Sequence, residues 1–282
     1  MNLDKAEKDG FEIDIEVRPT HTRLEYPIRN DALRPIRPYE DCAYDQLSKM
    51  LDDFHTVRKE REDAYRALVS AHQEMLMRLA RASEYKDGDT GIHILRIGHL
   101  SALLARSMGM SNDWCSTIQH AAPMHDVGKI GIPDDILKKQ GTLTVDEWEV
   151  MKKHPSIGAE ILGGSDVPVL KMAAQIALSH HEKWDGSGYP FGLRGEAIPL
   201  PGRIVALIDF FDALTMDRCY RRALPDEVVL EMMKEGSGKH FDPEIVDKAI
   251  SISSELVSLR DRINFEAAAD DRNWIGDWWL IY

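Results

Sequence analysis

The sequence predicts an all-α fold, in which one long N-terminal helix leads into a bundle of shorter helices. Three observations support this class. Residues 43–82 contain no glycine or proline and are rich in helix-forming residues. From about residue 83 to residue 257, apolar residues recur with helical spacing and no strand-rich stretch competes. Capping residues and prolines mark several helix starts in the same region.

The N-terminal 42 residues are expected to form a small separate element. Residues 11–17, FEIDIEV, alternate apolar and acidic side chains, which favours a short β-strand. Residues 18–40 contain four prolines and several arginines, a composition typical of an extended linker. We therefore assign residues 1–42 to an N-terminal element and linker whose fold, β or otherwise, stays open.

The segment 43–82 is predicted to be one continuous helix. Alternating steps of four and three residues separate its apolar positions, which gives an approximate heptad seam interrupted by one arginine. The seam consists of Met50, Phe54, Val57, Arg61, Ala64, Leu68, Ala71 and Met75. Two interpretations remain: the helix packs on its own domain, or it forms a dimerising stalk that carries a signal into the following domain.

Caps locate some of the shorter helices between residues 83 and 257. Ser111 is suited to cap a helix over residues 114–127. Thr144 and Glu147 have the spacing of a capping box, so a further helix is expected to begin there.

Composition limits the class of protein. The net charge of −13 argues against binding of a nucleic-acid polymer, although bound divalent ions can reverse the local field for a small anionic substrate. Neither an apolar run of about 18 residues nor the pattern of a signal peptide is found, so a protein without a membrane span is expected. The three cysteines are widely spaced and odd in number, which indicates reduced thiols in the cytoplasm.

Histidines carry the strongest functional signal. The run HHEKWDGSGYP occupies residues 180–190, and an HD pair stands upstream at residues 125–126. Neutral imidazoles and carboxylates are ligands of borderline divalent metals. Five of the eleven histidines lie in such motifs, namely His93, His125, His154, His180 and His181. A single histidine is more often structural, but this set in this order predicts a polynuclear metal site and a hydrolase.

Aspartates near these histidines fit the same chemistry. Asp126 can bridge two ions through its two oxygens, and two metals about 3.5–4 Å apart form a clamp for in-line attack on phosphorus. Lys129 follows His125 by four residues, which on a helix places both on one face and lets the lysine neutralise phosphate charge. Asp209 lies among apolar residues and requires a cation or a donor, while Asp212 is either a cap or a buried hydrogen-bond acceptor.

Two further segments are candidates for substrate contact. Tyr189 follows Gly186 and Gly188, which suits a tight loop over a substrate, although DGSGYP by itself is also compatible with an ordinary turn. Arg218 and Arg221 have the planar guanidinium groups that clamp phosphate oxygens, although a basic run is also typical of an exposed face.

These motifs resemble the HD-GYP family, a branch of the HD-domain metal-dependent phosphohydrolases. The resemblance covers about residues 75–257. It rests on HDVGKIGIPD, HHEKWDGSGYP, DTGIH, HPSIGAEIL and DFFDALTMDRCYRR, which occur in the order of the family. It implies an all-helical catalytic domain that hydrolyses cyclic di-GMP, a bacterial second messenger, to pGpG and/or GMP by a metal-activated hydroxide.

The resemblance also implies roles for individual residues. The implied metal ligands are His93, His125, Asp126, His154, His180, His181 and Asp209. Asp126 and Lys129 would be catalytic, and the substrate contacts would be Lys129, Tyr189, Arg218 and Arg221.

Two positions depart from the family pattern. Some members bind a third metal through a glutamate four residues before the first histidine, where this chain has the shorter Asp89. Two divalent ions are therefore expected, with Asp89 as the candidate ligand of a third. Cys219 stands where proline is common in the family, which is expected to loosen the substrate loop. Iron or manganese is the expected metal, and the same ligands also fit zinc, cobalt and nickel.

The expected organisation is a helical stalk at residues 43–82, a catalytic domain at 83–257 and an aromatic tail at 258–282. A homodimer through the stalk is expected, with the stalk and the tail as candidate surfaces for signalling proteins. Two alternative functions stay open: hydrolysis of another cyclic dinucleotide, and a catalytically weak sensor or scaffold that binds cyclic di-GMP.

Overall fold

The computed structural model describes residues 37–87, 91–217 and 222–269, with only the backbone for residues 37–41, 87 and 269. The chain divides into two compact units, Met1–Arg61 and Glu62–Tyr282. No strand occurs among the described residues, where two isolated bridges are the only β pairing. The predicted all-α class is confirmed. The predicted strand at residues 11–17 lies outside the described part of the chain.

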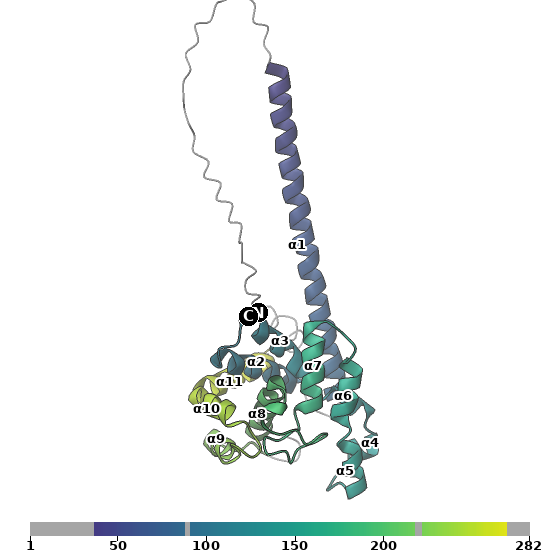
Figure 1. Cartoon of the computed structure of the whole chain (residues 1–282), viewed down its shortest axis with the longest axis vertical. Coiled ribbons are helices and arrows are strands. Elements are labelled where there is room, and N and C mark those ends of the chain that lie inside the picture. Colours follow the sequence, from purple (N-terminus) through teal and green to yellow (C-terminus); the bar gives the residue numbers. More distant parts are fainter. Residues whose placement is uncertain (1–36, 88–90, 218–221, 270–282) are drawn as a thin grey trace, which may run out of the picture. The chain divides into compact units, whose positions relative to one another are not determined.

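Most of the helices follow one another with short connections, and a longer loop joins α7 to η3 (Figure 1). Their bounds are α1 Arg37–Asp87, α2 Ile92–Ser107, α3 Asn112–Ala121, η1 Ala122–Met124, η2 Val127–Gly131, α4 Asp134–Leu137, α5 Val145–Met151, α6 His154–Leu162, α7 Pro168–Ser179, η3 Gly195–Ala197, α8 Leu200–Thr215, α9 Asp226–Glu235, α10 Pro243–Ser251 and α11 Ser253–Ala269.

Helix α1 contains the predicted helix 43–82 and extends beyond both of its ends. It begins at Arg37, inside the predicted linker. Pro38 does not prevent this, because it lies in the first turn, where a helix needs no N–H donor. The bulky apolar residues of the seam are more than half exposed. They are Met50, Phe54, Val57, Leu68 and Met75.

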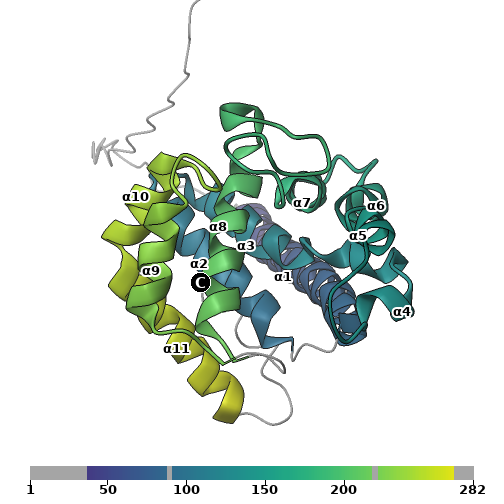
Figure 2. The ribbon, with the colours of Figure 1, turned by 90° about the horizontal axis from the view of Figure 1, so that it is seen from below.

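The second unit is built around α2, which is buried over most of its length. This helix packs against α3, α8 and α11, while α7 packs against α3, α6 and α8. Figure 2 shows α9, α10 and α11 on one side of α2 and α8, with α4, α5 and α6 on the other side. Because α2 and α8 lie at the centre, several of their polar side chains, such as His93, Arg96 and Asp212, are buried.

The predicted caps are present. Ser111 Oγ accepts a hydrogen bond from the backbone of Trp114, and Thr144 forms a reciprocal capping box with Glu147. The prediction of a helix over residues 114–127, however, is wrong about where that helix ends. Helix α3 ends at Ala121 and the short 3-10 helix η1 follows, because Pro123 has no N–H to continue the α-helical ladder.

Within the described residues, no helix is both long and apolar enough to cross a lipid bilayer.

Candidate metal centre

The seven histidines and aspartates implied as metal ligands lie together in two groups. Asp126, His154, His180 and His181 form one group, and His93, His125 and Asp209 form the other. Within each group the ligand atoms all lie within 4.8 Å of one another. Helices α2, α6 and α8, the turn between η1 and η2 and the turn directly after α7 supply these side chains, so the bundle assembles the centre from distant parts of the sequence.

Asp126 lies between the two groups. Its Oδ1 atom is 3.3 Å from His154 Nε2 and 3.5 Å from His180 Nε2. Its Oδ2 atom is 3.2 Å from His125 Nε2 and 2.8 Å from Lys129 Nζ. One carboxylate oxygen therefore faces each group, which is the arrangement that a bridging ligand requires.

Backbone carbonyls fix the tautomer of three histidines. In His125, His154 and His180, the Nδ1 atom lies 2.8–3.0 Å from the backbone carbonyl oxygen three residues earlier. A carbonyl oxygen only accepts hydrogen bonds, so Nδ1 carries the proton and Nε2 of the neutral ring keeps its lone pair.

Those Nε2 atoms fit a divalent cation. Together with Asp126 Oδ1 they are buried and make no hydrogen bond to any described residue. Native proteins seldom bury polar atoms without a partner, because each one loses its interactions with water. A set of imidazole and carboxylate donors without thiolate suits a borderline divalent metal.

Burial and neighbouring charges set the protonation of the centre. Burial lowers the pKa of His180 and of His181, and nearby imidazoles lower the pKa of His181 further, which keeps both rings neutral. Burial acts to raise the pKa of Asp126, but Lys129 and His125 hold that pKa well below its usual range. Burial acts to lower the pKa of His125, but Asp126 raises it to about 9, so without a metal this ring also carries a proton on Nε2, which a bound cation would displace.

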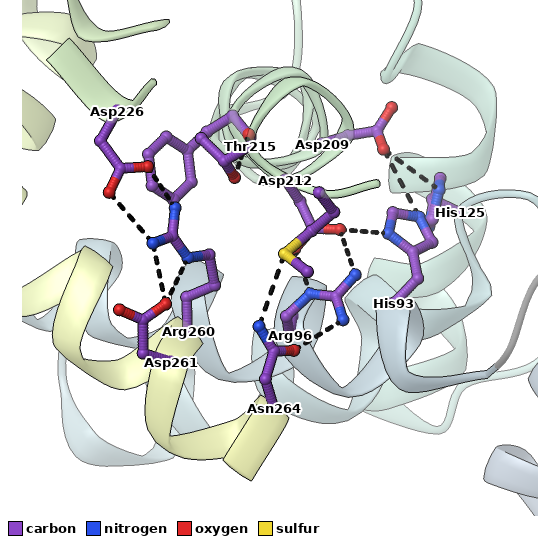
Figure 3. A network of polar contacts seen from close by, with 12 residues as sticks. His93, Arg96, His125, Asp209, Asp212, Thr215, Asp226, Arg260, Asp261 and Asn264 are labelled. Atoms are coloured by element: carbon purple, nitrogen blue, oxygen red, sulfur yellow. Dashed lines mark hydrogen bonds and ion pairs between the residues drawn. The ribbon is translucent and has the colours of Figure 1, made fainter. Parts of the chain in front are cut away.

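A buried ion-pair network supports the second group (Figure 3). His93 Nδ1 lies 2.7 Å from Asp212 Oδ2, and Arg96 binds the same carboxylate through two nitrogens at 2.5 and 2.8 Å. Arg96 also donates to Asn264 Oδ1 at 3.0 Å. Since Asp212 accepts at Nδ1, the Nε2 atom of His93 is left to face Asp209 Oδ1, 3.5 Å away.

The end of α1 holds the turn that carries the HD pair. Ser83 Oγ donates to the backbone carbonyl of Asp126 at 2.9 Å. Lys86 Nζ donates to the carbonyls of Ile130 and Ile132 at 2.7 and 2.6 Å. These contacts fix the backbone on which Asp126 stands.

The loop after His181 is compact. Glycine is required at residue 188, because a Cβ atom there would lie 2.3 Å from the backbone nitrogen of Lys183. Gly186 has a φ of +83°, in the left-handed region that favours glycine. The Tyr189–Pro190 peptide bond is cis. The predicted tight loop is therefore present.

Side-chain contacts attach this loop to the centre. The ring of Tyr189 stacks on that of His181, with a centroid distance of 4.8 Å and an interplanar angle of 25°. Buried Glu182 accepts hydrogen bonds from the backbone N–H groups of Phe191 and Leu193 at 2.8 and 3.0 Å. Tyr189 consequently lies over one edge of the metal-ligand group.

One detail differs from the expectations, and one open alternative is resolved. His125 and Lys129 do not share a helical face, because the HD pair occupies a turn between η1 and η2 and Lys129 contacts Asp126 instead. Asp212, for which two roles stood open, is a buried hydrogen-bond acceptor. Asp89, Cys219, Arg218, Arg221 and the tail residues from 270 to 282 lie outside the described residues.

The sequence analysis gave no role to Arg96 and Glu84, and it left two roles open for Asp212. Arg96 follows His93 by three residues, and Asp212 follows Asp209 by three. This spacing of about one helical turn was the sequence feature that could have marked them as neighbours of the ligands. Glu84 opens the EYKDGDTGIH motif and is buried beside the centre, where burial raises its pKa although His93 partly opposes this.

Comparison with known proteins supplies the family. Residues 51–245 match the sequence profile described as the HD domain. The chain belongs to the HD domain family. The family predicted from the motifs is thereby confirmed, and the HD pair that gives the family its name is His125 and Asp126.

Several relatives of this HD domain protein have named activities. A protein of Thermotoga maritima named "Cyclic di-GMP phosphodiesterase" is 40% identical over 240 residues, which cover 85% of this chain and 64% of the relative. A protein of Xanthomonas campestris named "Cyclic di-GMP phosphodiesterase response regulator RpfG" is 42% identical over 244 residues, which cover 84% of this chain and 65% of the relative. This chain thus spans slightly less than two thirds of the length of either relative.

A third relative carries a different specificity in its name. The "3'3'-cGAMP-specific phosphodiesterase 2" of Vibrio cholerae is 41% identical over 193 residues, covering 68% of this chain and 37% of the relative. Among solved structures, a cyclic GMP-AMP specific phosphodiesterase of the same species has a TM-score of 0.51 at 20% identity, covering 68% of this chain and 52% of that one. This likeness concerns the fold.

Proposed function

We propose that this HD domain protein is a metal-dependent phosphodiesterase that hydrolyses cyclic di-GMP to pGpG and/or GMP. The observation that carries the proposal is the Asp126 carboxylate, with one oxygen facing each of two groups of ligand atoms. The names of the relatives at 40% and 42% identity support the choice of substrate.

The proposed ligands divide between two divalent ions. Asp126, His154, His180 and His181 would hold one ion, and His93, His125, Asp209 and the second oxygen of Asp126 would hold the other. When bound, such a pair activates water as the nucleophile and stabilises the charge on the phosphate oxygens. We favour iron or manganese, although zinc, cobalt and nickel fit the same donors, and we keep Asp89 as the candidate ligand of a third ion.

The chain itself supplies charge and hydrogen bonds around the phosphate. Lys129 is partly exposed beside Asp126, so its ammonium group can contact a phosphate oxygen while it stays paired with the carboxylate. Burial raises the pKa of Tyr189, so its hydroxyl stays protonated and able to donate a hydrogen bond to the substrate. Arg218 and Arg221 complete the proposed contacts.

The proposal extends to the organisation of the molecule. We assign residues 1–42 to an N-terminal element, 43–82 to a dimerising stalk, 83–257 to the catalytic domain and 258–282 to a tail, whose first part continues α11 up to Ala269, a helix that packs against α2. The exposed apolar seam of α1 supports a homodimer, and the stalk and tail are the proposed surfaces for signalling partners. The free thiols of Cys42 and Cys115 support a location in the cytoplasm.

A second function is hydrolysis of a different cyclic dinucleotide. The Vibrio cholerae relative named for 3'3'-cGAMP favours it, since its identity of 41% is as high as that of the relatives named for cyclic di-GMP. The chemistry at phosphorus would be the same, so only a comparison of substrates separates the two.

The full chain, loaded with manganese or with iron under anaerobic conditions, should be assayed with cyclic di-GMP and 3'3'-cGAMP side by side. We expect turnover of cyclic di-GMP that a chelator removes and that His125→Ala or Asp126→Ala abolishes. His72→Ala is the control, because this exposed histidine lies on α1 and outside both groups.

Other outcomes would contradict the proposal. A tenfold or greater preference for 3'3'-cGAMP would favour the second function. Binding of cyclic di-GMP to the metal-loaded chain without hydrolysis would favour the sensor or scaffold.

A further inference from the structure

Trp148 is a large aromatic residue that stays exposed beside the candidate centre. It lies on α5, and 44% of its surface is accessible. Its ring centroid is 5.9 Å from that of Tyr189, with the planes at 78°. The ring of Tyr189 in turn stacks on His181 and lies 6.4 Å from the ring of His154. Aromatic rings therefore extend from the ligand group that includes Asp126 to the surface at Trp148.

The helix that carries Trp148 is fixed at its start. Thr144 and Glu147 form a capping box, and Lys139 Nζ contacts both carboxylate oxygens of Glu147 at 2.8 and 2.6 Å. Glu147, the residue before Trp148, is thus held both by Thr144 and by Lys139. An exposed indole on an anchored helix is a feature of binding surfaces, because it offers a flat apolar face that is already oriented.

We propose that Trp148 forms a stacking platform for one purine base of the substrate. This inference rests on the proposed function, in which Lys129 and Asp126 mark the place of the phosphate. In a nucleotide the base projects away from the phosphate across the sugar, and the contiguous rings of His181, Tyr189 and Trp148 lead outward from the ligand group. The exposed face of Trp148 therefore lies where a base needs an aromatic partner.

Stacking on an indole recognises the π face of a base and leaves its hydrogen-bonding edge untouched. Trp148 should consequently favour purine dinucleotides in general over pyrimidine ones, since a purine offers the larger surface. Discrimination between guanine and adenine must come from other residues.

Two measurements test the platform in the full chain. In the metal-loaded protein, Trp148→Ala should raise the KM for cyclic di-GMP by about tenfold, the size expected for one stacked base, and leave kcat within about twofold. Trp148→Phe should give an intermediate KM. In the metal-free protein, cyclic di-GMP should quench tryptophan fluorescence, and this quenching should be lost in Trp148→Phe.

Two controls isolate the effect. Phe265→Ala removes an aromatic residue on α11 that is 76% exposed, and it should leave KM and quenching unchanged. Cyclic di-UMP has the same ribose-phosphate ring with pyrimidine bases, so its KM should change less than that of cyclic di-GMP in Trp148→Ala.

The inference and the proposed function can fail separately. Wild-type protein that hydrolyses no cyclic di-GMP would overturn the proposed function, while the fluorescence titration would still test Trp148. Absence of quenching in the wild type, an unchanged KM in Trp148→Ala, or a fall in kcat alone would overturn the platform. The last result would show that Trp148 only supports the Tyr189 loop.

Discussion

Asp212 controls a proposed metal ligand although it belongs to neither ligand group. Its carboxylate is 1% exposed, and the charge is compensated by the two nitrogens of Arg96. Burial acts to raise the pKa of Asp212, but Arg96 and His93 hold it far below the usual range, so the carboxylate stays charged. By accepting from Nδ1 of His93, it turns Nε2 of that ring towards Asp209.

We therefore predict that Asp212→Asn weakens metal binding by about 10- to 100-fold, the range found when a partner of a ligating histidine is replaced. The variant should also lose about 3–5 kcal/mol of stability, because the buried guanidinium of Arg96 loses its counter-charge. Calorimetric titration of metal and urea denaturation measure the two effects.

Asp261→Asn is the matched control for Asp212→Asn. That carboxylate pairs with Arg260 near the surface and is 60% exposed, so both quantities should stay close to wild type. Equal metal affinity in Asp212→Asn and Asp261→Asn would refute the positioning role.

At the scale of elements, two side chains near the end of α1 hold the HD turn and the adjacent helix η2. Lys86, near the end of α1, donates to the carbonyls of Ile130 and Ile132 just after the HD turn. Ser83 on the same helix donates to the carbonyl of Asp126. Any displacement of this end of α1 would therefore move the backbone of Asp126.

We predict that Lys86→Met destabilises the chain by about 1–3 kcal/mol and lowers metal affinity, because three backbone carbonyls and Asp134 lose a charged partner while the apolar stem is kept. Urea denaturation and metal titration again provide the measurement. Lys138→Met is the control, since Lys138 is half exposed and pairs with Asp134, which Lys86 also contacts, but holds no backbone carbonyl of the HD turn among the described contacts. Unchanged metal affinity in Lys86→Met would show that the end of α1 does not act on the HD turn.

The same elements show what sequence reasoning can and cannot predict. Helix α1 and the caps at Ser111 and Thr144 were predictable because they depend on neighbours within a few residues. The ligand set followed from motifs, since each ligand stands in a recognisable run of residues. The turn at the HD pair was missed because Pro123 ends α3 there and Lys86, from another helix, holds the turn.

The pairing of Arg96 with Asp212 was missed for a related reason. It joins two helices that are far apart in the sequence, and no local pattern specifies such a contact. The same holds for Trp148 and Tyr189, which meet only once the loop after His181 has folded.

At the scale of the whole molecule, the exposed apolar seam of α1 indicates association with a second chain. Its members Phe54 and Val57 are each 63% exposed in the single chain, and Met50 is 68% exposed. Water contact with a row of apolar side chains is unfavourable, and pairing with the same row of a second chain removes it. We expect the gain to exceed the disturbance caused by Arg61 in the seam.

We therefore predict that the full chain is a dimer at micromolar concentration and that Phe54→Glu converts it to a monomer. A glutamate at this position would place a negative charge in the seam of both chains and oppose their association. Thr56→Glu adds the same charge two residues away, at an exposed position that points away from the seam, and should leave the dimer intact. Light scattering gives the mass directly. A wild-type mass equal to one chain, or equal masses for the two variants, would show that α1 does not join two copies.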